Sequence, residues 1–118
     1  MPKVLVVEDE PSQAEVLTIL LGLEGFEIAV AVNGKDALDN IDQVQPDLIV
    51  TDYMMPLMNG GEMVARIRAM PAYGKVPIVM TSATDVRQAE KYSAHYDAFF
   101  RKPYLWNDLF ATIRRLLP

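Results

Sequence analysis

Five polar residues of the chain have types and spacing that suit a shared chemical site. Glu8 and Asp9 come directly after a short apolar run near the amino terminus, and Asp52 ends a second run. Ser82 and Lys102 follow two further apolar runs. If these runs are parallel strands of one sheet, their carboxyl ends meet at the same edge. That edge then gathers three carboxylates, a hydroxyl group and an ammonium group.

The chemistry of such a group centres on a cation and a phosphoryl group. Neighbouring carboxylates raise one another's pKa and repel one another unless a cation neutralises them. A set of oxygen ligands without His or Cys suits a hard ion such as Mg²⁺ or Mn²⁺. Beside such an ion a carboxylate can act as a nucleophile and become an acyl phosphate, with Lys102 balancing negative charge and Ser82 hydrogen-bonding phosphoryl oxygens. We therefore expect metal-dependent phosphoryl chemistry on a carboxylate.

The elements that position these residues alternate between strands and helices. Runs of β-forming residues predict strands at residues 3–7, 26–32, 48–50, 76–81 and 98–100. Apolar residues at helical spacing predict helices from Pro11 to about Glu24, around 37–41, over 63–70, from about 84 to 94 and over 105–116. Because parallel neighbours need crossover connections, five strands alternating with five helices predict a doubly wound α/β fold.

Composition and charge limit the class of protein. A length of 118 residues, with 51% hydrophobic and 23% charged residues, fits one domain over residues 1–118. The net charge of −5 argues against direct binding of this chain to nucleic acid. The absence of cysteine excludes disulfides and thiolate metal sites. No export signal is visible, and no apolar run approaches the ~20 residues that cross a bilayer, so we expect a cytoplasmic protein without a membrane span.

The segments that contain the five polar residues closely resemble the motifs of one known family in their order and spacing. Glu8-Asp9, Asp52, Ser82-Ala83 and Lys102-Pro103 resemble the receiver (CheY-like) domains of two-component response regulators, and the resemblance covers essentially the whole chain. It implies a flavodoxin-like (βα)5 sandwich of three layers with a parallel sheet of order 2-1-3-4-5. It also implies that a sensor histidine kinase, a histidine phosphotransfer protein or a small phosphodonor phosphorylates Asp52.

The same resemblance implies a set of site residues. Mg²⁺ is expected to be held by Asp9, Asp52 and the backbone carbonyl of Met54, with Glu8 acting mainly through bound water. Lys102 is expected to contact the phosphoryl group, and Pro103 to form a cis or turn peptide after it.

The resemblance further implies a conformational switch. Ser82 is expected to move toward the phosphoryl group while Phe99 turns inward, which alters the face formed by the fourth helix, the fifth strand and the fifth helix. That face then binds a downstream effector, or a second copy in a homodimer. The side chains of Met54 and Thr84 are expected to tune the lifetime of the phosphorylated form.

Three aromatic residues have two interpretations each. Phe99 fits a static core or surface position as well as a moving element. Trp106 and Phe110 lie four apart on the last predicted helix, where they suit either core packing or an exposed partner site. Core packing is favoured for this pair.

Two other functions compete with a phosphorylated switch. Haloacid-dehalogenase-like phosphatases usually carry a second acid two residues after the nucleophile, where this chain has Met54. A receiver fold that serves only as an unphosphorylated interaction module is the second alternative, and the retention of every expected site residue argues against it. We therefore expect a signalling switch that catalyses only its own phosphorylation and dephosphorylation, rather than a turnover enzyme.

Overall fold

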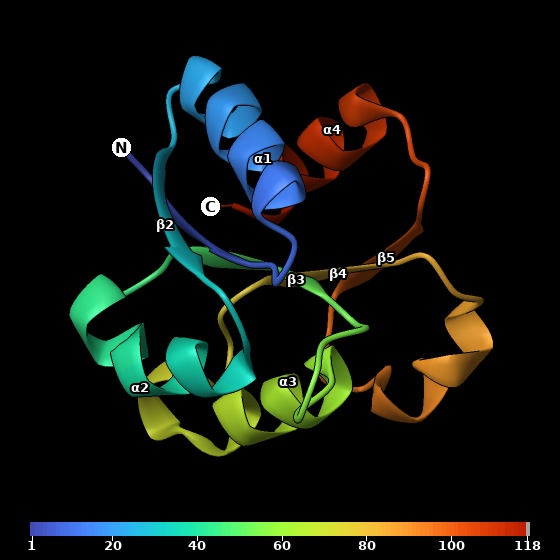
Figure 1. Ribbon diagram of the computed structural model, residues 1–118. Coiled ribbons are helices and arrows are strands. Elements are labelled where there is room, and N and C mark those ends of the chain that lie inside the picture. Colours follow the sequence, from blue (N-terminus) through green and yellow to red (C-terminus); the bar gives the residue numbers. More distant parts are fainter. Residues whose placement is uncertain (118) are drawn as a thin grey trace.

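The computed structural model describes residues 1–117 as one sheet between two layers of helices (Figure 1). The strands are β1 (Lys3–Val7), β2 (Glu27–Ala31), β3 (Leu48–Asp52), β4 (Ile78–Ser82) and β5 (Ala98–Arg101). The α-helices are α1 (Pro11–Leu23), α2 (Gly34–Val44), α3 (Gly60–Ala69) and α4 (Trp106–Leu116). The described residues also form three short 3-10 helices: η1 (Pro71–Tyr73), η2 (Val86–Gln88) and η3 (Glu90–Tyr92).

The sheet is parallel and runs in the order β2-β1-β3-β4-β5. Helices α1 and α4 cover one face of the sheet (Figure 1). The other face is covered by α2, α3 and the 3-10 segment, which is the name used below for η2 and η3 together (residues 86–92). The predicted doubly wound fold and its strand order are therefore confirmed. Within residues 1–117, no helix combines the length and the apolar character that crossing a bilayer requires.

Alternation along the central strands divides the core into two clusters. Val4 and Val6 of β1 pack in the cluster beneath α1 and α4, together with Leu21 and Ile113. Leu5, between these two valines, packs in the cluster on the α2 and α3 side. Because successive side chains of a strand point to opposite faces, one apolar run supplies both layers. The strand ends are thereby held in a fixed register at one edge.

The predicted helix from about 84 to 94 is wrong. The structure forms η2 and η3 there, with backbone N–H groups bonded three residues back, from Ala89 to Val86 (3.0 Å) and from Tyr92 to Ala89 (2.9 Å). Ala89 is buried and Tyr92 is half-buried, while the residues between and around them are mostly exposed. Hydrogen bonds that run three residues back define a 3-10 helix, whereas those of an α-helix run four residues back.

Two helices begin earlier than their apolar spacing predicts, because asparagine caps start them. The Asn33 side chain accepts a hydrogen bond from the Asp36 backbone N–H (2.7 Å) at the start of α2. Asn59 forms a capping box with Glu62 at the start of α3. These caps let α3 begin immediately after the loop that follows β3.

The aromatic pair of the last helix packs on the core, as favoured above. Trp106 and Phe110 are partly buried against the cluster beneath α4. Their rings are parallel, with centroids 6.2 Å apart. Arg114 lies over the Phe110 ring, 4.8 Å from its centroid, and extends this stack along the helix.

Candidate functional site

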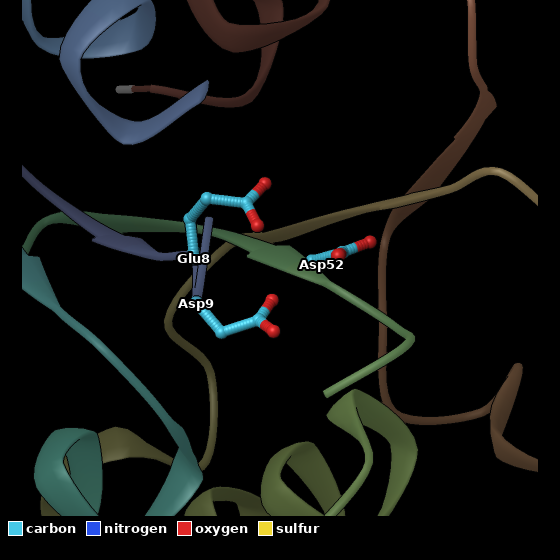
Figure 2. A group of neighbouring side chains, drawn as sticks. All are labelled: Glu8, Asp9 and Asp52. Atoms are coloured by element: carbon cyan, nitrogen blue, oxygen red, sulfur yellow. The ribbon is translucent and has the colours of Figure 1, made fainter. Parts of the chain in front are cut away.

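The carboxyl ends of the central strands bring three acidic residues together. Glu8 and Asp9 leave the end of β1 on opposite sides of the chain, and Asp52 lies beside them at the end of β3 (Figure 2). One carboxylate oxygen from each of the three residues lies within 4.8 Å of the others. The expectation that parallel strand ends gather these acids therefore holds in the structure.

Close packing of the following helix shapes the position of Asp52. The Gly60 N–H, at the start of α3, donates a hydrogen bond to the Tyr53 carbonyl (2.7 Å). A Cβ at position 60 would overlap the backbone carbonyl of Asp52. Only glycine permits this approach, so α3 begins directly against the end of β3.

Two of the three carboxyl groups are buried and have perturbed pKa values. Glu8 is 4% exposed and Asp52 is 8% exposed. Burial raises the pKa of Asp52; Lys102 opposes this shift and the charge of Asp9 adds to it. Burial also raises the pKa of Glu8; the Glu10 N–H opposes this shift and the charge of Asp52 adds to it. A cation bound among these groups would relieve the cost of their ionisation.

Lys102 reaches this cluster from the loop after β5. Its ammonium group donates to Glu8 Oε1 (3.3 Å) and lies 3.5 Å from Asp52 Oδ1. Its backbone N–H donates to the Ser82 carbonyl (2.7 Å), and the peptide to Pro103 is cis. Although buried, Asp52 Oδ1 accepts no hydrogen bond from any residue within 1–117. This oxygen of the central carboxylate is thus ion-paired with Lys102 but accepts no hydrogen bond from the described residues.

Ser82 ends β4 with its hydroxyl group engaged by a neighbour. The hydroxyl oxygens of Ser82 and Thr84 lie 2.8 Å apart, and the Thr84 N–H donates to Ser82 Oγ (3.1 Å). Ser82 is fully buried. In this conformation the serine hydroxyl is therefore held by the loop that follows it.

The remaining predicted site residues lie around the cluster. The Met54 side chain is half exposed and, with Asp9 and Asn59, lines a cavity of about 500 Å³. Phe99 is half-buried on the α2 and α3 side of the sheet, with its ring centroid 6.0 Å from that of Tyr96. This packing is compatible with a static Phe99 and with a Phe99 that moves.

Two contacts at this edge involve residues that the sequence does not mark. Gln13, in the first turn of α1, accepts a hydrogen bond from the Lys102 ammonium (2.6 Å). The Tyr53 hydroxyl donates to the Gln88 carbonyl (2.9 Å). The only available signal is position, since Gln13 lies four residues after Asp9 and Tyr53 directly follows Asp52.

The donor set fits a hard divalent cation. All candidate ligand atoms are oxygens, and three of them converge within a few ångströms. A free oxygen on Asp52 and an ammonium group next to it complete an arrangement suited to phosphoryl chemistry. These observations together fit a Mg²⁺ site beside a buried carboxylate.

Comparisons with known proteins agree with this geometry. A family model described as a response regulator receiver domain matches residues 4–114. The DNA-binding response regulator MtrA of Mycolicibacterium smegmatis is 40% identical over 117 residues, which cover 98% of this chain and 50% of that protein. The chain spans about half the length of the curated relatives that it matches.

Solved structures share the whole fold. The response regulator TrrA from Thermotoga maritima, in complex with Mg²⁺-BeF, has a TM-score of 0.91 at 31% identity, and the match covers 99% of this chain and 100% of that chain. The Vibrio cholerae chemotaxis protein CheY4 has a TM-score of 0.91 at 28% identity, with 99% of each chain covered. Both likenesses extend over all five strands.

Proposed function

The chain belongs to the response regulator receiver domain family of two-component signalling, and we propose that Asp52 is the residue on which it is phosphorylated. The observation that carries this assignment is the state of Asp52: a buried carboxylate with one oxygen free of hydrogen bonds and an ammonium group 3.5 Å away. Asp9 is exposed and Glu8 is bonded to Lys102, so neither combines these features.

The charge arrangement supports nucleophilic attack by Asp52 on a phosphoryl donor. A carboxylate oxygen forms the new bond to phosphorus, and the bond from phosphorus to the donor's leaving group breaks. Lys102 is placed to balance the negative charge of the transferred group, and Ser82 to hydrogen-bond it after release from Thr84. The product is an acyl phosphate on Asp52.

We assign the metal to the acidic cluster. Asp9 and Asp52 would hold Mg²⁺ or Mn²⁺ with the backbone carbonyl of Met54, and Glu8 would act mainly through water. The ion would supply charge neutralisation and orientation for the phosphoryl oxygens. The solved relative with Mg²⁺-BeF supports this choice of ion.

Family membership supports a proposal for the partners. We propose that a sensor histidine kinase or a histidine phosphotransfer protein supplies the phosphoryl group in the cytoplasm. Phosphorylation then biases the domain toward a second conformation with altered affinity for an effector or for another copy of the chain. The face carrying the 3-10 segment, β5 and α4 is the proposed output surface. Met54, two residues after Asp52, occupies the place of the second acid of phosphatases, which supports a switch rather than a turnover enzyme.

Intact mass spectrometry tests this proposal. The chain is incubated with acetyl phosphate or phosphoramidate, with and without Mg²⁺, and compared with Asp52→Asn and with the exposed control Asp39→Asn. We expect a Mg²⁺-dependent gain of one phosphoryl mass that hydroxylamine removes, retained in Asp39→Asn and lost in Asp52→Asn. A folded, metal-binding chain without an adduct and without released phosphate would instead support an unphosphorylated interaction module.

A further inference from the structure

The nearest partner of the Lys102 ammonium is a neutral amide rather than a carboxylate. Lys102 Nζ lies 2.6 Å from Gln13 Oε1, 3.3 Å from Glu8 Oε1 and 3.5 Å from Asp52 Oδ1. The contact with Asp52 is an ion pair without a hydrogen bond. The ammonium group is therefore held toward α1, although the proposed phosphoryl site lies at Asp52.

The position of Gln13 follows from the start of α1. That helix begins at Pro11, three residues after Glu8, so its first turn stands over the sheet edge that carries the acids. Gln13 and Lys102 line the same cavity of about 460 Å³, between α1 and the start of α4. The contact thus joins two segments that are 89 residues apart in the chain.

Because the Gln13 amide is neutral, its hydrogen bond with Lys102 is weaker than an ion pair would be. An ammonium group attracts a carboxylate or a phosphoryl oxygen through the full charges of both partners, whereas the oxygen of an amide offers it only a dipole. A carboxylate at position 13 would compete with a phosphoryl group for Lys102, whereas an amide holds the lysine less strongly. Gln13 is therefore a partner that a phosphoryl oxygen can replace.

We propose that Gln13 is a positioning residue that holds Lys102 on the α1 side of the site until a phosphoryl group on Asp52 displaces it. This inference rests on the proposed function. The hydrogen-bonding strength of the side chain at position 13 then sets part of the balance between the unmodified and the phosphorylated conformations. A weaker partner favours the phosphorylated form, and a stronger one opposes it.

Two substitutions of Gln13 with opposite effects test the proposal. Gln13→Leu removes the acceptor at similar volume, and Gln13→Glu strengthens it. At saturating Mg²⁺ we expect the affinity for beryllofluoride to rise about three- to tenfold in Gln13→Leu and to fall by at least as much in Gln13→Glu. Binding is measured by calorimetry and by the fluorescence of Trp106, the only tryptophan, which lines the same cavity. Gln43→Leu and Gln43→Glu, at an exposed position of α2, are the matched controls.

A double-mutant cycle separates positioning from local structure. In a Lys102→Ala background the gain from Gln13→Leu should disappear, because its effect acts through the ammonium group. A gain that persists in that background, or changes of the same sign in both Gln13 variants, would overturn the positioning role while leaving the phosphoacceptor assignment intact. A parent chain that neither binds beryllofluoride nor gains a phosphoryl mass would overturn both proposals.

Discussion

The hydroxyl group of Tyr53 donates a hydrogen bond to the backbone carbonyl of Gln88, 35 residues further along the chain. Tyr53 directly follows the proposed acceptor, and Gln88 ends η2 on the proposed output surface. The ring of Tyr53 also lies near that of Tyr92 in η3, with centroids 6.4 Å apart. The site and the 3-10 segment are thus joined by one buried side chain.

Replacing Tyr53 by Phe removes this hydrogen bond and keeps the ring. We expect a loss of about 1 kcal/mol in the free energy of unfolding and faster amide hydrogen exchange across η2 and η3. Tyr73→Phe is the control, since its hydroxyl bonds to Ile41 and Asp42 at a distant place. Unchanged exchange in η2 and η3, or the same increase in both variants, would show that Tyr53 does not hold this segment.

Gly61 allows the 3-10 segment to dock on α3. A Cβ at this position would overlap the ring of Tyr92. We expect Gly61→Ala to lower the free energy of unfolding by about 1–3 kcal/mol, although alanine favours a helix. Gly22→Ala in α1, where nothing lies within 4 Å, should gain up to about 1 kcal/mol. Urea unfolding compares the two variants, and stabilisation by both would contradict the packing argument.

The contact between Ser82 and Thr84 should oppose the proposed movement of Ser82. Thr84→Val keeps the shape and removes the hydroxyl that lies 2.8 Å from Ser82 Oγ. Because only the unmodified conformation loses a hydrogen bond, we expect beryllofluoride with Mg²⁺ to bind about two- to fivefold more tightly. Thr18→Val in α1, whose hydroxyl bonds to the Ala14 carbonyl, should leave the affinity unchanged. Weaker binding by Thr84→Val would argue that Thr84 supports the phosphorylated form.

The raised pKa of Asp52 predicts how stability depends on pH without metal. Below the ordinary pKa of 3.8, Asp52 is protonated in both the folded and the unfolded chain, so its contribution to stability is fully present. As the pH rises through the raised pKa of Asp52 in the folded chain, Asp52 ionises and the folded state loses stability. Burial and the charge of Asp9 make this loss larger, and Lys102 makes it smaller. Asp52→Asn carries no such charge. We expect it to become more stable than the parent by about 1–3 kcal/mol toward neutral pH, or roughly 3–6 °C in Tm per kcal/mol.

Urea unfolding in a chelator from pH 4 to pH 8 measures this difference. Comparing parent and variant removes contributions from groups that both chains share, such as the Asp85 pair with Arg87. A parent that gains stability relative to Asp52→Asn as the pH rises would contradict the predicted sign.

Binding of Mg²⁺ should offset the stability that the folded chain loses when Asp52 ionises. A ligand at tenfold above its Kd stabilises the folded state by about 1.4 kcal/mol. We expect Mg²⁺ to raise the Tm of the parent and of Asp39→Asn, and to have a much smaller effect on Asp9→Asn and Asp52→Asn. An equal rise in all four chains would place the ion elsewhere.

Local patterns along the chain are sufficient to predict most of the architecture. Continuous apolar runs predict the strands, because the central strands are buried on both faces. Helical spacing predicts four of the five expected helices, because burial of one face imposes its period on the residues. The acids Glu8, Asp9 and Asp52 follow from the same logic, since parallel strands bring their carboxyl ends to one edge. The segment over 84–94 is the exception. Its inward-facing residues, Ala89 and Tyr92, are three apart, which suits an α-helix as well as a 3-10 helix, so their spacing does not predict the two 3-10 helices that form there.

Beyond the five polar residues expected at the sheet edge, only the tertiary structure decided which distant polar groups meet. No period relates Gln13 to Lys102, or Tyr53 to Gln88, because these contacts depend on how α1 and the 3-10 segment pack against the sheet. Their geometry arises from the fit of whole elements, in which a glycine such as Gly61 sets the distance of approach. The sequence by itself determined the doubly wound α/β class and the acidic cluster, because both follow from local burial patterns, while the strand order 2-1-3-4-5 was expected from the family resemblance. The packing of distant elements determined how Lys102 is held and how the site is joined to η2 and η3.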